Sequence, residues 1–313
     1  MSDIRHRPIL VNEVMDLLKV RPDGVYADLT FGEGGHSEPI LQAGVHSLIA
    51  QDQDLQALDR YRAEGAERAN PRLILRHATI SEFAEDSENF DKFDGIFADL
   101  GVSTFQLLHS GRGFTFQNPE PLDMRMDLER GIPLSERLAD IEADELADII
   151  YQTTELRQSR ILARRILHAF HAGELKTSMD LAAVAASVLA GPPHKQKRSH
   201  PATPLFLGMR MWVNEEYDQV AQGVPALFRC LKPGGRLGVL TFHSVEDRLV
   251  KHAFQRMAGL RAEEAQAIFY ATEASEKAAA ELVTRKPVTP SDDEIGRNPR
   301  ARSTKFRVIE RRH

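Results

Sequence analysis

One stretch of the chain has residue types and spacing that suit the binding of a nucleoside. Residues 26–37 read YADLTFGEGGHS, so Gly32, Gly34 and Gly35 closely follow an apolar run. Glycine adopts positive φ and lets a ligand approach the backbone. A strand, a glycine turn and a helix in succession are therefore typical of ligand sites in α/β sheets. The alternative interpretation is an ordinary tight turn between a strand and a helix.

An acidic residue stands where such a ligand would be anchored. Asp52 follows the apolar run 47–51 and lies 20 residues after Gly32, the usual distance to the carboxylate that binds the ribose hydroxyls in dinucleotide folds. We assign Asp52 to the ligand and Asp54 to the N-cap of the next helix. Ser37 occupies the place of the third fingerprint glycine, which favours an adenosyl ligand without phosphates, such as S-adenosylmethionine.

Three other residues are candidates for proton transfer or for contact with a substrate. Asp99 and Ser103 lie at the end of one apolar run, and His243 lies at the end of another. Carboxylate, hydroxyl and imidazole groups can all accept protons from a substrate. For Asp99 the alternative is an acid in a turn at the end of a strand. For Ser103 the alternative is a helix N-cap, and for His243 it is a supporting or core histidine.

The predicted elements place these residues on an α/β sheet. Apolar runs alternate with helical patterns, which predicts a parallel, doubly wound sheet. The predicted strands cover residues 25–29, 47–51, 72–77, 93–99 and 236–242, and residues 303–309 have the alternation of an edge strand. We also expect a helix over 205–231, a glycine turn at 232–235 and a surface helix over 258–283.

A second, all-helical region interrupts this sheet. Helical patterns at 135–151, 155–173 and 178–190 have no strand partner. We therefore expect residues 1–106 and 205–313 to form one discontinuous domain and residues 107–204 to form a helical insertion.

Composition narrows the class of protein. The chain has 313 residues, 42% of them hydrophobic, and one cysteine, Cys230, so no internal disulfide can form. Cys230 ends a helical pattern, so we expect a packed thiol there. Neither a signal peptide nor an apolar run of membrane-spanning length is present, and we expect a cytoplasmic protein. No cluster has metal-ligand spacing, so we predict no metal site.

The charge is unevenly distributed. The net charge is −6, yet residues 297–313 contain seven Lys or Arg and a single acidic residue. A second basic cluster contains Lys195, Lys197 and Arg198. A charged run is usually only a solvated face, but two basic segments on an acidic body permit a polyanionic partner.

Several motifs, taken together and in order, resemble the bacterial ribosomal RNA small-subunit methyltransferase H family. The resemblance spans nearly the whole chain. It rests on HRPIL at 6–10, DLTFGEGGHS at 28–37, DGIFADLGVS at 94–103, RGFTF at 112–116, PLDMRMD at 121–127, HPAT at 200–203, PGGRL at 233–237, FHSVEDR at 242–248 and NPRARS at 298–303.

The resemblance implies a Rossmann-like class I methyltransferase sheet that carries a helical domain. It implies S-adenosylmethionine as cofactor and methylation of N4 of one cytidine in the decoding region of small-subunit ribosomal RNA. The family's cofactor positions fall on Gly34, Gly35, His36, Asp52, Ile80, Asp99 and Gln106, to which the turn residue Gly32 is added. An aromatic residue of the family is replaced by Ile80, so that contact can only be apolar.

The same reading predicts contacts with RNA. The target base must leave its stack to enter such a site. For Phe114 and Phe116 we predict stacking on RNA, with packing in a core as the alternative. Asp123 and Arg125 either shape the base pocket or pair with each other. Phosphates are expected at Lys195, Lys197, Arg198, Arg300 and Arg302.

Two segments depart from the family pattern. Residues 151–155 read YQTTE in place of the family's Tyr-Gly-Glu-Glu, and residues 200–207 read HPATPLFL, which lacks an arginine and a glutamine of the family. These departures put RNA contacts in doubt and leave open a non-catalytic RNA-binding or ribosome-assembly protein. A nicotinamide oxidoreductase is the other alternative. The oligomeric state, including a homo-oligomer, is also left open.

Overall fold

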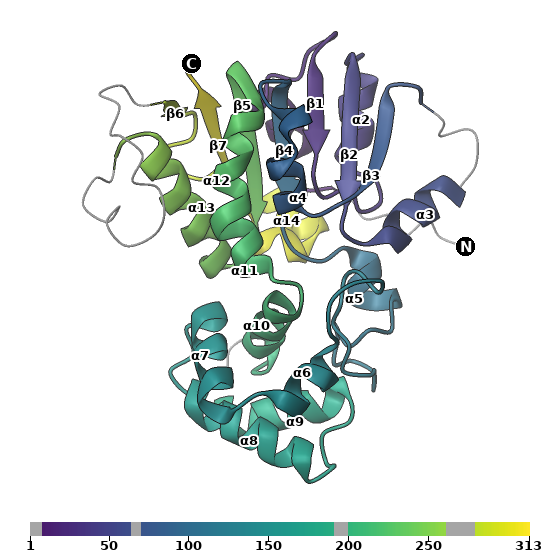
Figure 1. Ribbon diagram of the computed structural model, residues 1–313, viewed down its shortest axis with the longest axis vertical. Helices are drawn as coiled ribbons and strands as arrows, with labels where there is room; N and C mark the ends of the chain where they lie inside the picture. Colours follow the sequence, from purple (N-terminus) through teal and green to yellow (C-terminus); the bar gives the residue numbers. More distant parts are fainter. Residues whose placement is uncertain (1–7, 64–69, 191–199, 261–278) are drawn as a thin grey trace. The chain divides into compact units, whose positions relative to one another are not determined.

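The computed structural model describes residues 8–63, 70–190, 200–260 and 279–313. The chain divides into two compact units, Met1–Gly101 with Asp218–His313 and Val102–Tyr217 (Figure 1). The second unit extends past the predicted end of the insertion at residue 204. It does so because helix α10 (Thr203–Val213) contributes Leu205 and Met209 to the core of that unit.

Within the described residues, the first unit is built on a seven-stranded sheet of order β3-β2-β1-β4-β5-β7-β6 (Figure 1). The first five strands pair in parallel, and β7 pairs antiparallel with both β5 and β6. The strands are β1 (Val25–Asp28), β2 (Ser47–Asp52), β3 (Leu73–His77), β4 (Phe93–Asp99), β5 (Leu231–Thr241), β6 (Ala280–Leu282) and β7 (Lys305–Arg311).

Both faces of this sheet are covered, as the alternation of side chains along its strands requires. Ala27 and Ile96 point to one face, against α4 (Ile80–Glu85), α12 (Val224–Ala226) and α13 (Ser244–Met257). Tyr26 and Phe97 point to the other face, where buried residues of α1 (Val11–Leu17), α2 (Ser37–Gln42) and α3 (Leu55–Ala63) pack. The result is a three-layer α/β/α unit, as the sequence predicts.

Two strand predictions need correction. The last strand, β7, is not an edge strand, because it lies between β5 and β6. The edge position belongs to β6, in a region where the sequence predicts a surface helix over 258–283, most of which lies outside the described residues. The glycine turn predicted at 232–235 lies within β5, where the pairing with β4 shifts register between Phe93 and Gly95.

The second unit is all-helical in its described part. The predicted helix over 135–151 is two helices, because Ile141 and Glu142 are extended. The predicted helix over 205–231 ends at Val213. The helices of this unit are α5 (Thr104–His109), α6 (Leu134–Asp140), α7 (Ala143–Thr154), α8 (Ser159–His171), α9 (Ser178–Leu189) and α10.

No helix among the described residues is long and apolar enough to cross a membrane. The remaining helical segments are short: α11 (Glu216–Asp218), α14 (Asp292–Arg297), a π-helix at Gln219–Gly223, and 3₁₀ turns at Ser87–Asn89, Leu227–Cys230 and Pro299–Ser303. Cys230 is buried, and burial raises the pKa of its thiol to about 11, which fits the packed thiol that the sequence indicates.

Candidate functional site

The glycine turn after β1 is held by the carboxylate that ends the strand. One oxygen of Asp28 accepts a hydrogen bond from the Thr30 backbone N–H at 3.2 Å, and the other accepts from the Ser37 hydroxyl at 2.7 Å. Between these anchors, Gly32 and Gly34 have φ of 55° and 81°, a conformation that favours glycine. The turn is therefore fixed at both ends and keeps its central backbone free of Cβ atoms.

Asp52, at the end of β2, lies beside this turn. Its carboxylate accepts one hydrogen bond from the Gly32 N–H at 2.7 Å and one from the Asp54 N–H at 2.8 Å. Asp54 accepts from the Gln56 N–H at 3.1 Å and so caps α3, as predicted. Burial raises the pKa of Asp52 to about 6, although both backbone hydrogen bonds oppose this rise. Asp52 stays the predicted partner of ribose hydroxyls.

Asp99 ends β4 on the same carboxyl edge of the sheet. Its backbone N–H donates to the Thr30 hydroxyl at 2.6 Å, which ties the end of β4 to the glycine turn. Burial, with the nearby charges of Asp28 and Glu246, raises the pKa of Asp99 to about 8. Its Oδ1 is buried and has no hydrogen-bond partner within the described residues. Such an atom marks a position where a ligand or substrate donor would be accepted.

His36 faces the other oxygen of Asp99. Its Nδ1 lies 3.6 Å from Oδ2 of Asp99, and its Nε2 lies 2.9 Å from the Ile9 carbonyl oxygen. Burial lowers the pKa of His36 to about 4, so the ring is neutral at pH 7. The carbonyl can only accept, so the single ring proton belongs on Nε2. Nδ1 then presents a lone pair to a carboxyl group that itself retains a proton.

These carboxyl groups favour a ligand with a positive charge. Asp28, Asp52 and Asp99 lie at the ends of three neighbouring parallel strands, and none of their contacts within the described part of the chain involves Lys or Arg. A pyrophosphate would be repelled here, whereas a cation would be attracted and would favour the ionised acids. The geometry therefore supports S-adenosylmethionine, with its sulfonium and ammonium groups, over a nicotinamide dinucleotide.

His243 follows β5 and is the N-cap residue of α13. Its Nε2 lies 2.8 Å from Oε1 of Glu246, while Oε2 of Glu246 accepts from the Phe242 N–H at 2.9 Å. The pair gives His243 the supporting contact that the sequence left open as its alternative role. Sequence reasoning missed Asp28 and Glu246, although Asp28 stands in the motif at 28–37.

The remaining cofactor candidates are largely engaged in local structure. Ile80 is buried in the core of the first unit. In the second unit, Ser103 and Gln106 form a capping box at the start of α5, in which each side chain accepts the backbone N–H of the other. The N-cap alternative for Ser103 is therefore the one that the structure supports.

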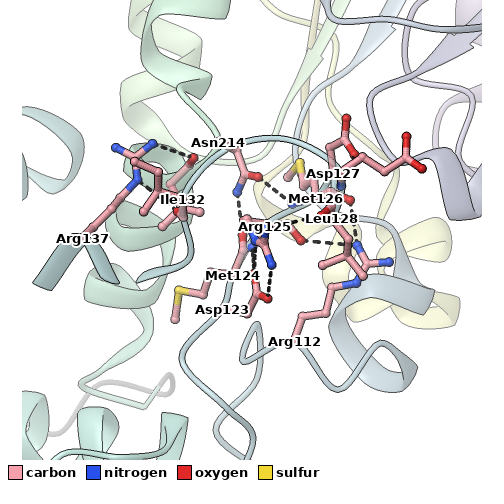
Figure 2. Close-up of polar contacts among 12 residues, drawn as sticks. Arg112, Asp123, Met124, Arg125, Met126, Asp127, Leu128, Ile132, Arg137 and Asn214 are labelled. Atoms are coloured by element: carbon pink, nitrogen blue, oxygen red, sulfur yellow. Dashed lines mark hydrogen bonds and ion pairs between the residues drawn. The ribbon is translucent and has the colours of Figure 1, made fainter. Parts of the chain in front are cut away.

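The predicted base-pocket loop is rigidly held within the second unit (Figure 2). Arg125 donates to both carboxylate oxygens of Asp123, at 2.8 and 2.9 Å, so these two residues do pair with each other. Asn214 accepts from the Met126 N–H at 2.6 Å and donates to the Met124 carbonyl at 2.8 Å. No local pattern in the sequence indicates Asn214, because its partners are about 90 residues away.

The two predicted stacking aromatics differ. Phe114 is 6% exposed and belongs to the core of the second unit, so its ring does not offer a face to a base, and that prediction is corrected. Phe116 is half-buried, with its ring centroid 4.7 Å from that of the exposed His200 and 4.8 Å from that of Phe206. Of the two, Phe116 stays a candidate for stacking.

Of the five residues predicted to contact phosphates, the structure describes two. Lys195, Lys197 and Arg198 lie outside the described residues. At the C-terminal end, most cations are neutralised within the first unit, while Arg300 and Arg302 are exposed. The ion pairs are Lys305 and Arg307 with Asp247, Arg311 with Asp91, and Arg312 with Glu281.

The strand order, the antiparallel β7, the glycine turn and the acids at the strand ends define a Rossmann-like methyltransferase unit. The sequence comparison then identifies the family. The MraW methylase family model matches residues 3–312, and the chain belongs to this family. The resemblance to this family that the motifs indicate is therefore confirmed. The methyltransferase class and S-adenosylmethionine as the cofactor are confirmed with it.

Curated relatives extend over nearly the whole chain. A protein of Nitrobacter winogradskyi named "Ribosomal RNA small subunit methyltransferase H" is 40% identical over 98% of this chain and 91% of its own length. A protein of the same name from Acidobacterium capsulatum is 39% identical over 100% of both chains.

Solved structures give distant matches. An S-adenosylmethionine dependent methyltransferase of Mesorhizobium loti has a TM-score of 0.43 at 9% identity and covers 96% of each chain. An rRNA methylase of Streptococcus thermophilus has a TM-score of 0.42 at 10% identity and covers 100% of each chain.

Proposed function

We propose that this protein methylates the exocyclic N4 of one cytidine in the decoding region of small-subunit ribosomal RNA. The names of the full-length relatives support ribosomal RNA of the small subunit as the substrate. The motifs at 94–103 and 242–248 support the choice of an amino nitrogen. The observation that carries the chemistry is the buried Oδ1 of Asp99, an acceptor that has no partner within the described residues.

The first unit supplies the cofactor-binding residues. Asp52 would hold the ribose hydroxyls, and the backbone of Gly34 and Gly35 would lie against the methionyl end. When bound, S-adenosylmethionine supplies a methyl group made electrophilic by the sulfonium charge. The raised pKa values of Asp28, Asp52 and Asp99 fit this charge, because a nearby cation favours the ionised form of each acid.

Asp99 is proposed to act on the target amine. The lone pair of a cytosine amino group is delocalised into its ring, so the nitrogen is a weak nucleophile until an N–H is polarised. With Asp99 ionised beside the sulfonium charge, its Oδ1 would accept that N–H and take the proton as the N–C bond forms. The bond between sulfur and the methyl carbon breaks in the same step, and S-adenosylhomocysteine is released. Nδ1 of His36 lies 3.6 Å from Oδ2 of the same carboxyl group. Orientation of the amine can supply about 7–11 kcal/mol of the barrier reduction.

The second unit is proposed to recognise the RNA. Its loop at 121–127 is pinned by Asn214, and Phe116 with His200 provides a partly exposed aromatic pair. An extruded base can stack on such rings. The substrate is expected to be RNA within the small ribosomal subunit.

A methyl-transfer assay tests the proposal. Small subunits from a strain that lacks the modification are incubated with the protein and methyl-labelled S-adenosylmethionine, then digested to nucleosides. The label is expected in N4-methylcytidine, and Asp99→Ala is expected to abolish transfer while S-adenosylhomocysteine still binds. Label in another nucleoside refutes the specificity, and no label at all favours a non-catalytic RNA-binding protein.

A further inference from the structure

The outer face of helix α8 carries arginines that no carboxylate of the described residues neutralises. The helix contains three arginines and no acidic residue. Leu162, Ile166 and Leu167 of α8 pack in the core of the second unit, whereas its arginines and histidines are exposed. Ile161, Arg164, His168 and His171 follow one another at intervals of three and four residues, so they form a single exposed stripe.

Three arginines of this region lack ionic partners. Arg157, in the turn before α8, and Arg164 and Arg165 within it are exposed, and no carboxylate in the described residues pairs with any of them. Arg160 differs, because it lies 3.1 Å from Asp144 and 3.8 Å from Asp148 of α7. We refer to Arg157, Arg164 and Arg165 as the α8 arginines.

Other arginines of the second unit are engaged. Arg125 and Arg137 pair with Asp123 and Glu215. Arg210 is buried and forms a bidentate pair with Glu216, at 2.7 and 2.8 Å. Arg112, also buried, donates to main-chain carbonyl groups, and Arg130 lies 3.4 Å from Asp127. Among the described arginines of this unit, only the α8 arginines therefore lack a partner.

We propose that the α8 arginines bind the phosphate backbone of the RNA substrate. An arginine fork fits a phosphate bidentately, and unpaired arginines on one face suit a partner with regularly spaced negative charges. Exposed Tyr151 in the last turn of α7 and exposed Ile161 in α8 add apolar surface close to the arginines in sequence, which suits contact with sugars or an unstacked base. This inference rests on the proposed function, because it assigns a surface to the same RNA.

The test compares Arg164→Gln/Arg165→Gln with wild-type protein. Binding of the small-subunit RNA is measured by fluorescence anisotropy over a range of salt concentrations. Each lost phosphate contact lowers the slope of log K against log salt by about 0.7 to 0.9, so the double variant should lose about 1.4 to 1.8. The KM for small subunits should rise about tenfold with kcat unchanged, because these contacts position the RNA and do not touch the reacting atoms.

Two control variants each remove one positive charge elsewhere. Arg160→Gln lies on the same helix but removes a cation that is already paired, and Arg72→Gln removes an exposed arginine of the first unit. Both should keep the wild-type slope within about 0.3, since neither loses a phosphate contact. Equal unfolding temperatures and equal affinity for S-adenosylhomocysteine show that the variants are folded.

The outcomes separate this inference from the proposed function. If wild-type protein methylates small subunits and the double variant keeps the wild-type KM and salt slope, the inference is wrong and the function stands. If the double variant binds naked RNA normally but has a raised KM for assembled subunits, the face contacts a ribosomal protein, and the RNA assignment is wrong. If wild-type protein transfers no methyl group, the function fails, while the anisotropy measurement still decides whether the α8 arginines bind RNA.

Discussion

Replacement of Asp99 by Asn tests whether the carboxyl group at the end of β4 is kept neutral by its surroundings. Burial and the charges of Asp28 and Glu246 raise its pKa from 3.8 to about 8 in the folded protein. The folded state thus keeps a proton that the unfolded state has released. The resulting stabilisation is complete below about pH 3.8 and is lost as the pH rises through 8. Asparagine has the same shape as the neutral acid and does not titrate.

The size of the effect follows from proton linkage. Between pH 6 and pH 8, a group with a folded pKa of 8 and an unfolded pKa near 4 loses about 2 kcal/mol of stabilisation. Asp28 and Asp52, whose pKa values are raised to about 6, each lose only about 0.4 kcal/mol over the same interval. Asp99 therefore dominates this pH window, and the cofactor-free wild-type protein is expected to be less stable at pH 8 than Asp99→Asn.

Urea unfolding at pH 6 and pH 8 measures this effect. The free energy of unfolding of wild-type protein should fall about 2 kcal/mol further than that of Asp99→Asn over the interval. Asp52→Asn is the matched control, because it makes the same chemical change at an acid with a lower pKa. Between pH 6 and pH 8, the fall in its free energy of unfolding should stay within about 0.5 kcal/mol of the fall for wild-type protein. If wild-type and Asp99→Asn proteins have the same pH dependence, Asp99 is ionised at neutral pH and the reasoning is wrong.

Four other expectations follow from the same contacts. Affinity for S-adenosylmethionine should rise from pH 6 to pH 8 more steeply than affinity for S-adenosylhomocysteine, which lacks the sulfonium charge; calorimetry with both ligands would show it, and equal slopes would contradict it. Asp52→Ala should lower S-adenosylhomocysteine affinity at least tenfold, about 1.4 kcal/mol, in the same titration. Asn214→Ala leaves the Met124 and Met126 backbone groups without their partner and should destabilise the protein by about 1–3 kcal/mol in urea unfolding. Arg307→Ala leaves Asp247 with Lys305 alone and should cost about 3 kcal/mol, with partial recovery in Arg307→Lys; an unchanged midpoint would show the pair to be dispensable.

Both the glycine turn and the acids at the strand ends bear on which ligand the protein binds. The missing third glycine of the fingerprint favours an adenosyl ligand over a dinucleotide, but it is a single position. The structure adds an independent reason, since three carboxyl groups gather at the strand ends without a cation among their contacts in the described residues. Both lines indicate a cationic nucleoside.

The sequence by itself determined the parts that depend on neighbouring residues. The strands at 25–28, 47–52 and 93–99, the glycine turn and the capping role of Asp54 all follow from local periodicity and turn chemistry. These patterns act over a few residues, so they can be read without the fold. The motifs, taken together and in their order along the chain, also identified the family. The family in turn implied the cofactor and the class of reaction.

Only the tertiary structure decided the state of the charged groups. Asp99 has a raised pKa because it is buried, and because Asp28 and Glu246, far away in the sequence, lie near it in the folded protein. The C-terminal basic segment looks free in the sequence, yet β7 brings Arg307 to Asp247 and neutralises it. Arg157, Arg164 and Arg165, in contrast, stay without an ionic partner in the described residues. Burial and pairing depend on contacts between distant segments. For that reason the positions of the charges could be predicted from the sequence, but not which of them are available to a ligand.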